Sequence, residues 1–185
     1  MMDAPYHTVL KMALPVADPY ACHKVIAWYF SPSREDERDY QFVAGETDVY
    51  VRASSPRILD AAWKRMDLPR AGAAGILTST IWFDATRFNA DGMRTRWRQP
   101  SAMREWLRER LRPVGDVDIA SLDYLPGRPL NKPGVPQGVV MTPVRYLARV
   151  RIRDEDAVAR LLRDGMGRGR AFGFGCVLFQ EDRHV

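Results

Sequence analysis

Cysteine is scarce in this sequence, and no hydrophobic run approaches the length of a membrane span. Cys22 and Cys176 lie far apart with no second cysteine near either, so their spacing indicates neither a disulfide framework nor a cysteine-based zinc site. A membrane span needs about 20 apolar residues. Residues 1–5 lack the charged and apolar regions of a secretory signal. We therefore expect a soluble, cytoplasmic protein with no membrane partner.

Sequence motifs of the common hydrolases and nucleotide-binding enzymes are also missing. The chain has 3 histidines and contains no HExxH, no nucleophile elbow and no Gly-Lys-Ser/Thr of a Walker A loop. His7 opens a predicted strand, and His184 lies in the last two residues, where chain ends usually fray. We expect no metal site and no cofactor.

Lysine is rare too, because 24 of the 28 basic residues are arginine. Residues 1–90 carry 10 basic and 11 acidic side chains, whereas residues 91–185 carry 18 and 12. Arginine pairs bidentately with phosphate and stacks on bases, so a polyanion is the natural partner of the second half. A GC-rich genome would also favour arginine over lysine. The placement of the arginines must therefore decide between this explanation and a polyanionic partner.

The order of the predicted elements repeats along the chain. The expected elements are a strand at 7–15, a helix at 18–30, strands at 39–44 and 48–53, a helix at 56–67 and a strand at 75–88, then a strand at 93–98, a helix at 101–112, strands at 117–125 and 138–153, a helix at 154–164 and a strand at 172–180. The pattern predicts an α+β protein of two tandem ferredoxin-like (RRM-like) βαββαβ domains, at residues 1–90 and 91–185. That architecture includes many RNA-binding modules but does not itself define a function.

Tyr20 and His23 are the first candidates for chemistry. Cys22, Val25, Ile26 and Tyr29 have the spacing of a buried helical stripe, and His23 lies about 100° from it. Tyr20, three residues earlier, should project beside His23 on an exposed or cleft-facing flank. A lone surface histidine is more often unremarkable than catalytic, so the residues alone leave both interpretations open.

A glycine-rich segment, residues 165–175, is the second feature. It follows a predicted helix and precedes a strand, which is the wrong order for a dinucleotide fingerprint. Gly167 and Gly169 allow the backbone to approach an anion closely, and Arg168 and Arg170 add positive charge. The segment therefore suits a phosphate backbone, although Gly165 also has the position of a helix C-cap.

Arginines at alternate positions are the third feature. They form two predicted strand faces, Arg94, Arg96 and Arg98 on one and Arg145, Arg149, Arg151 and Arg153 on the other. Like charges on neighbouring strands repel unless an anion covers them, which favours a nucleic-acid track over a merely solvated face. A helical row, Arg104, Arg108 and Arg112, is diluted by Glu105 and Glu109.

These features together resemble the CasE family, the CRISPR-associated repeat-processing endoribonucleases of the RAMP superfamily. The similar segments are Asp18 to His23 with Trp28 and Phe30, Gly127-Arg128-Pro129, and the glycine-rich signature from Gly165 to Gly175. The glycine-rich signature is the most specific of these, but it is shared by superfamily members that do not cut RNA. This chain is also somewhat short for the family.

The resemblance implies metal-independent cleavage of the repeat hairpin of a precursor CRISPR RNA. The 2′-hydroxyl attacks its own phosphate and leaves a 2′,3′-cyclic phosphate and a 5′-hydroxyl. His23 would act as general acid or base and Tyr20 would assist it, with Lys132, Arg128 or Lys24 as the stabilising cation. The mature crRNA would stay bound, and the other partners would be subunits of a Cascade-like effector complex.

Two other functions compete with this one. A noncatalytic RNA-binding subunit of the same fold would bind the repeat equally well without cutting it. A ferredoxin-like protein that acts on a small metabolite fits the arginine distribution poorly and would need an apolar pocket.

Overall fold

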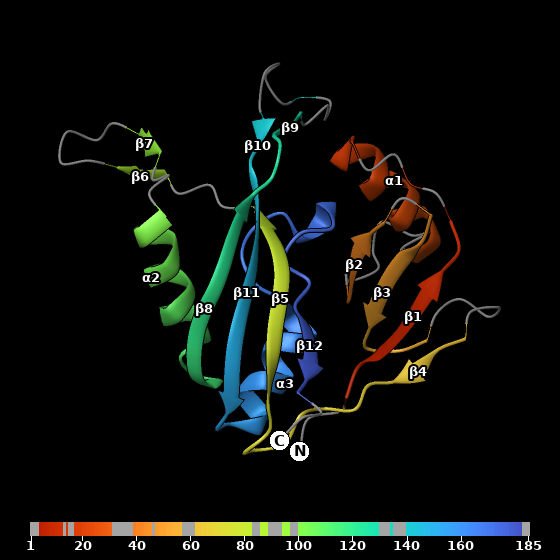
Figure 1. Cartoon of the computed structure of the whole chain (residues 1–185). Helices are drawn as coiled ribbons and strands as arrows, with labels where there is room; N and C mark the ends of the chain where they lie inside the picture. The colour runs from red at the N-terminus through yellow and green to blue at the C-terminus, as the bar shows by residue number, and fades with distance from the viewer. Residues whose placement is uncertain are drawn as a thin grey trace.

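Two four-stranded antiparallel sheets form the protein (Figure 1). The computed structural model describes residues 4–12, 14, 17–30, 39–45, 47–56, 62–82, 86–88, 94–96, 100–129, 134 and 140–182. Both sheets have the strand order of a ferredoxin-like unit, in which the first strand lies between the third and the fourth. The predicted class, two tandem ferredoxin-like units, is therefore confirmed.

The first unit consists of one sheet with a helix on it. Its elements are β1 (Tyr6–Leu10), α1 (Pro19–Phe30), β2 (Tyr40–Ala44), β3 (Val49–Ala53) and β4 (Lys64–Arg65), and the strand order is β2-β3-β1-β4. Cys22, Ile26 and Phe30 of α1 pack against Phe42 and Val51 of the sheet. This contact fixes α1, and with it Tyr20 and His23, on the first sheet.

The second unit contains the longer strands. Its elements are β5 (Ala74–Trp82), α2 (Pro100–Leu111), β8 (Gly115–Tyr124), β11 (Pro143–Ile152), α3 (Glu155–Asp164) and β12 (Leu178–Glu181), with strand order β12-β5-β11-β8. Along β11 the side chains alternate as predicted, with Tyr146, Ala148, Val150 and Ile152 buried. Both α2 and α3 pack against this buried face.

Shorter elements interrupt the second unit. The pair β6 (Thr86–Phe88) and β7 (Arg94–Arg96) lies between β5 and α2, and the pair β9 (Arg128–Pro129) and β10 (Val140–Met141) lies between β8 and β11. A 3-10 turn, η1 (Arg170–Phe172), falls within the glycine-rich segment. None of the helices among the described residues is long and apolar enough to span a membrane.

The structure corrects four of the predicted elements. β5, expected to close the first unit, pairs with β11 and β12 and is the first strand of the second sheet. The fourth strand of the first sheet is instead β4, inside the expected helix at 56–67, so residues 62–67 are not helical. The strand expected from residue 172 begins at Leu178. The strand expected at 93–98 to open the second unit is β7, which pairs with β6 in a separate two-stranded sheet. The predicted boundary between residues 90 and 91 stays a prediction.

The reason for the first error is the length of β5. A strand of 9 residues can bury alternate side chains along the whole of β11, whereas β1 is only 5 residues long. Gly75, Leu77, Ser79 and Ile81 are buried in this way. A pattern of alternating burial predicts a strand but not the sheet that it joins.

Candidate functional site

Helix α1 carries the two candidate catalytic residues near its N-terminus. The Asp18 carboxylate accepts hydrogen bonds from the backbone N–H groups of Tyr20, at 2.9 Å, and Ala21, at 3.1 Å. Asp18 is thus the predicted N-cap, because it satisfies N–H groups that have no partner inside the helix. The cap fixes the first turn, from which Tyr20 projects.

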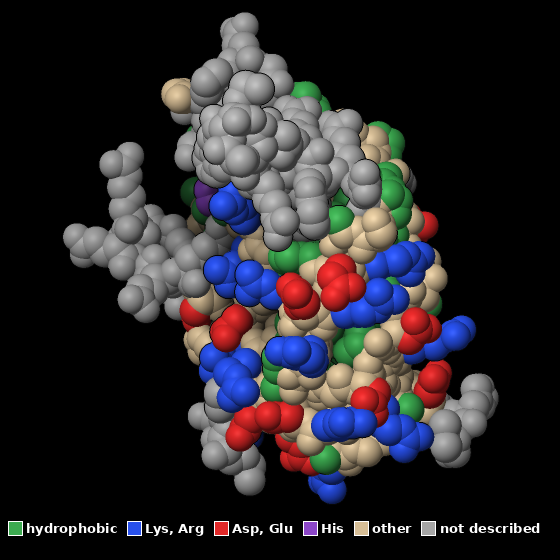
Figure 2. Space-filling model, turned by 90° about the vertical axis from the view of Figure 1, so that its left-hand side faces the viewer, with side chains coloured by type: hydrophobic (Ala, Val, Ile, Leu, Met, Phe, Trp, Pro, Cys, Tyr) green, Lys and Arg blue, Asp and Glu red, His purple; other side chains and the backbone are tan. Residues whose placement is uncertain are grey.

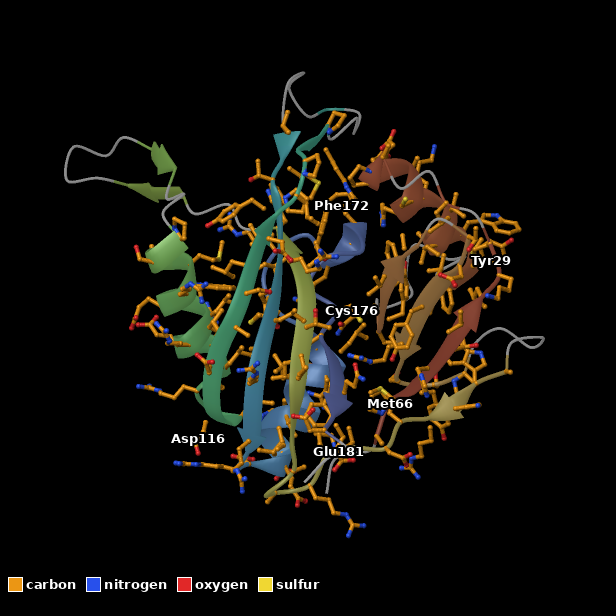
Figure 3. The ribbon with its side chains drawn as sticks, in the orientation of Figure 1. Tyr29, Met66, Asp116, Phe172, Cys176 and Glu181 are labelled. Atoms are coloured by element: carbon orange, nitrogen blue, oxygen red, sulfur yellow. The ribbon has the colours of Figure 1, made fainter. Side chains whose placement is uncertain are left out.

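The buried side of α1 is slightly rotated from the predicted stripe. Cys22 and Ile26 are buried as expected, but Tyr29 is 43% exposed and Phe30 is buried instead. Phe30 is held by aromatic contacts with Tyr40 and Trp63, whose ring centroids lie 5.1 and 6.1 Å away. Tyr29 points away from the second unit (Figure 3).

Tyr20 and His23 lie side by side on the half-buried flank of α1, as their spacing predicts. Their ring centroids are 6.2 Å apart and their planes are inclined by 40°. The Lys24 ammonium lies 6.0 Å from the centroid of the Tyr20 ring. One turn of helix therefore presents an imidazole, a phenol and a cation.

The glycine-rich segment contacts this turn of helix. The ring of Phe172, in η1, meets the ring of His23 edge to face, with centroids 5.7 Å apart and an angle of 73°. Figure 3 shows Phe172 in the turn between the second sheet and α1. The two motifs that the sequence singled out separately thus form one site, and the role of Phe172 as their contact had no signal in the sequence.

Glycine is required at position 173 by both its backbone angle and its neighbour. Its φ is +82°, and a Cβ built there would lie 2.7 Å from Cε2 of Phe42 in β2. Gly165 caps α3 as predicted, with a φ of +69°. The base of the segment is closed by a hydrogen bond from the Met166 N–H to the Gly175 carbonyl, at 2.8 Å. These constraints hold Phe172 in place beside His23.

Gly173→Ala is expected to lower the free energy of unfolding by about 2 kcal/mol, because alanine is strained at positive φ and its Cβ displaces Phe42. The matched control is Gly72→Ala, where φ is +89° and a Cβ would meet no atom within 4 Å. Urea unfolding of both variants measures the difference. Equal losses of unfolding free energy in the two variants would show that the clash with Phe42 does not contribute to the destabilisation.

Three side chains hold the C-terminal end of α3, just before the glycine-rich segment. Arg52 of β3 donates to the Leu162 carbonyl, Gln41 of β2 donates to the Arg163 carbonyl, and Arg170 donates to the Asp164 carbonyl. These carbonyls have no partners within the helix, and the helix dipole makes its C-terminal end attractive to a cation. Arg52 and Gln41 of the first unit therefore bind the C-terminal end of α3 directly.

Arg52 is the most deeply buried of these three side chains, with 1% of its surface exposed. Besides the Leu162 carbonyl, its guanidinium donates to the Val177 carbonyl, at 2.8 Å, and to the Tyr50 hydroxyl, at 3.3 Å. Leu162 and Val177 stand on either side of residues 165–175. Arg52 thus fixes both ends of the glycine-rich segment to the first sheet, a role that its isolated position in the sequence did not indicate.

Arg128 is a described cation outside α1 whose charge acts on a residue of that helix. It belongs to β9, and its charge acts on the Cys22 thiol: burial raises the pKa of Cys22, and Arg128 partly opposes this. Cys22 immediately precedes His23, so Arg128 lies on the α1 side of the second unit. Lys132 falls outside the described residues.

The arginine row on β11 is partly neutralised by aspartates of the adjacent strand. Arg145 pairs with Asp123 at 3.3 Å, and Arg153 pairs with Asp116 at 2.6 Å. Arg149 is directly opposite Asp118, and Arg151 is opposite Asp116. The expectation that only an external anion could relieve the repulsion of this row is therefore wrong, because β8 supplies carboxylates. The assignment of Arg149 and Arg151 to RNA stays a prediction.

The face that includes α2 also mixes both charges. Basic and acidic side chains are interspersed over its described part (Figure 2), and Arg108 lies 3.9 Å from Glu105. Arg94 and Arg96 belong to β7, opposite Phe88 and Thr86 of β6. Arg98 lies outside the described residues.

The other histidines lie away from this site or outside the described residues. His7 is in β1, and its pKa is lowered by burial and by the nearby charges of Arg52 and Lys64. His184 lies outside the described part of the chain. Among the described residues, no group of three or more His, Cys, Asp or Glu side chains is arranged to hold a metal ion.

Several solved structures with a similar fold are CRISPR proteins. A structure of the CRISPR endoribonuclease Cse3 bound to 19 nt RNA superposes with a TM-score of 0.70 and 19% identity, covering 96% of this chain and 99% of that one. Cas6e from Escherichia coli str. K-12 gives 0.66 and 15%, covering 94% and 98%. A chain of a CRISPR RNA-guided surveillance complex gives 0.70 and 16%, covering 96% and 100%. At these identities the likeness establishes the fold.

The sequence itself matches a family model. No curated protein matches the chain significantly. The family model described as CRISPR associated protein matches residues 77–180, which is more than half of the chain. The match includes the second sheet except for the first three residues of β5 and the last residue of β12. The protein belongs to this CRISPR associated protein family.

Proposed function

We propose that this protein is a metal-independent endoribonuclease that cuts the repeat stem-loops of precursor CRISPR RNA. The observation that carries the proposal is the contact of the Tyr20 and His23 pair with Phe172 of the glycine-rich segment. It brings a proton-transfer group against a segment with Arg168 and Arg170, the kind of cationic loop that suits a phosphate backbone. Membership of the CRISPR associated protein family and the fold of Cse3 support the same substrate.

The reaction needs no external nucleophile. The 2′-oxygen attacks the adjacent phosphorus, loses its proton and forms the new P–O bond, while the bond to the 5′-oxygen breaks and that oxygen takes up a proton. The products are a 2′,3′-cyclic phosphate and a 5′-hydroxyl. His23 handles one of these two protons, because an imidazole exchanges protons readily near neutral pH.

The neighbours of His23 complete the proposed chemistry. Tyr20 orients the ribose or phosphate through its hydroxyl or shares in proton transfer, since its ring lies beside that of His23. The charge of the phosphorane is stabilised by Arg128 or by Lys24, which lies against Tyr20. Lys132 remains a third candidate from the sequence.

The RNA hairpin is held along its backbone, because A-form RNA is recognised mainly by shape and phosphate contacts. The proposed contacts are Arg94, Arg96, Arg98, Arg128, Lys132, Arg149, Arg151, Gly167, Arg168, Gly169 and Arg170. The aspartates of β8 reduce the share that Arg149 and Arg151 contribute, since part of their charge is already compensated.

The proposed partners are the repeat hairpin before cleavage, the mature crRNA after it, and the other subunits of a Cascade-like effector complex in the cytoplasm. A protein of the same fold occurs in a CRISPR RNA-guided surveillance complex. A subunit that keeps its product would remain with the mature RNA in such an assembly.

Cleavage of labelled repeat RNA in excess EDTA tests the proposal. The RNA is transcribed from the CRISPR array of the same genome, and we expect one cut in EDTA at the rate seen with Mg²⁺. The 5′ fragment should resist phosphatase until acid opens its cyclic phosphate, and the 3′ fragment should accept phosphate from a kinase without prior treatment. A 3′-hydroxyl on the 5′ fragment, or no cleavage in EDTA, would contradict the mechanism.

A noncatalytic RNA-binding subunit is the second candidate. It is favoured by the extent of the family match, because residues 77–180 exclude the whole of α1 with Tyr20 and His23. Tight binding of the intact repeat, without cleavage in either EDTA or Mg²⁺, would support this function over the first.

A further inference from the structure

A cavity of about 670 Å³ opens beside the candidate active site, between the two units. One wall belongs to the first sheet and the other to α3 and the glycine-rich segment. Residues 39–41, Ser54, Arg163, Asp164 and residues 167–171 line it. The volume lies within the range of about 300–1,000 Å³ that is typical of sites for small ligands.

The charges in the cavity favour an anionic ligand. Both carboxylates are engaged within the protein: Asp39 accepts a hydrogen bond from the Ser54 hydroxyl, and Asp164 binds the Arg163 guanidinium with two contacts of 2.7 and 3.0 Å. Arg170 donates to the Asp164 carbonyl, and its charge also acts on the Asp164 carboxylate, but three arginines line the cavity against two aspartates. Arg168 is an exposed cation on the same wall. Arg168 and Arg170 thus present positive charge to a ligand in the cavity.

The cavity adjoins the candidate active site through η1. Arg170 and Ala171 line the cavity, and the next residue, Phe172, contacts the His23 ring. Successive Cα atoms are 3.8 Å apart. A nucleotide next to a phosphate bound at His23 is therefore within reach of the cavity.

The cavity walls are fixed in position. Gln41 joins the two walls through its hydrogen bond to the Arg163 carbonyl, and it is 6% exposed. A preformed cavity accepts a base without the cost of ordering a loop. Sequence-specific RNA recognition usually targets unpaired nucleotides, because their bases can turn out of the strand and into a site on the protein.

We propose that this cavity binds a single unpaired nucleotide next to the scissile phosphate, with its base between the two walls and its phosphate on Arg168 and Arg170. The inference rests on the proposed function, because it takes repeat RNA as the ligand. It adds a base-recognition site to a surface that otherwise contacts the RNA backbone. The site determines which repeat is positioned for cleavage.

An abasic scan of the repeat RNA tests the inference. Each unpaired nucleotide is replaced in turn by an abasic residue, in RNA that carries a 2′-deoxy substitution at the mapped cleavage position so that it stays intact. Equilibrium binding is measured at one fixed salt concentration, because phosphate contacts are salt-dependent. We expect one position near the cut at which the abasic residue weakens binding about tenfold, the size of one lost base contact.

Variants of the cavity identify where that nucleotide binds. Ser54→Trp fills the cavity from the wall opposite the loop, and Arg168→Ala removes a cation. The control is Arg160→Ala, which removes an exposed arginine of α3 that does not line the cavity. In Ser54→Trp the abasic penalty should fall from tenfold to less than twofold. Arg168→Ala should instead weaken binding of the intact and the abasic RNA by the same factor, because the abasic residue keeps its phosphate, and the control should keep both the affinity and the full penalty.

The outcomes separate this inference from the proposed function. A penalty that stays tenfold in Ser54→Trp, or no sensitive position in the wild type, would overturn the cavity assignment while leaving cleavage intact. No binding of the unmodified repeat by the wild type would instead reject the proposed function. Binding by the wild type, with an abasic penalty that is lost in Ser54→Trp and kept in Arg160→Ala, would support both.

Discussion

His23→Ala is expected to slow cleavage of the repeat RNA about 10²–10⁴-fold, the usual contribution of a positioned general acid or base. RNA affinity should change by less than about twofold, because the proposed phosphate contacts come from arginines outside α1. Single-turnover rates and equilibrium binding, measured on the same RNA, separate the two effects. Circular dichroism and urea unfolding would confirm that the loss of the Phe172 contact leaves the fold intact.

Two further variants test whether the loss of cleavage is specific to His23 and how much the Tyr20 hydroxyl contributes. His7→Gln removes a histidine of β1 that lies outside the candidate site and should leave the rate unchanged. Tyr20→Phe keeps the ring beside His23 and removes only the hydroxyl, so its rate loss measures the contribution of that group. Cleavage by His23→Ala at the wild-type rate would remove His23 from the mechanism.

Arg52→Met is expected to lower the free energy of unfolding by about 3 kcal/mol. Methionine fills much of the volume but leaves the Leu162 and Val177 carbonyls buried without their donor, and each unsatisfied carbonyl costs about 1–3 kcal/mol. Relief from burying a cation offsets part of this loss. Since domains are stable by only about 5–15 kcal/mol, the change should be plain in urea unfolding.

Arg149→Met and Arg52→Lys are the comparisons for this variant. Arg149 is exposed on β11, so its replacement should shift stability by less than about 0.5 kcal/mol. Lysine at 52 keeps the charge but cannot reproduce the fork of donors, so an intermediate loss is expected. A loss with Arg52→Met as small as that with Arg149→Met would show that the carbonyls find other donors.

Features set by neighbouring residues were predictable from the sequence. Asp18 before Pro19 specified the start of α1, and the turn after residue 44 specified β2 and β3 to within a residue. The adjacency of Tyr20 and His23 followed from helical geometry alone. The C-cap at Gly165 followed from the glycine that ends a helical pattern.

Features set by contacts between distant segments were not predictable. Nothing near residue 52 indicates that its side chain reaches Leu162 and Val177, and nothing in β5 indicates which sheet it joins. Asp116 and Asp118 of β8 alternate like the arginines of β11, but the pairing of the two strands depends on register across a long connection. Phe172 was visible only as one apolar residue in a glycine-rich segment.

Because His23 and Phe172 come from different units, the candidate site forms only when the two units have packed together. His23 is carried by a helix on the first sheet, and Phe172 by a turn that follows the last helix of the second unit. A nascent chain or a proteolytic fragment that contains only one of them lacks half of the site. If the proposed activity holds, the order of synthesis delays RNA cutting, because Phe172 is synthesised 149 residues after His23.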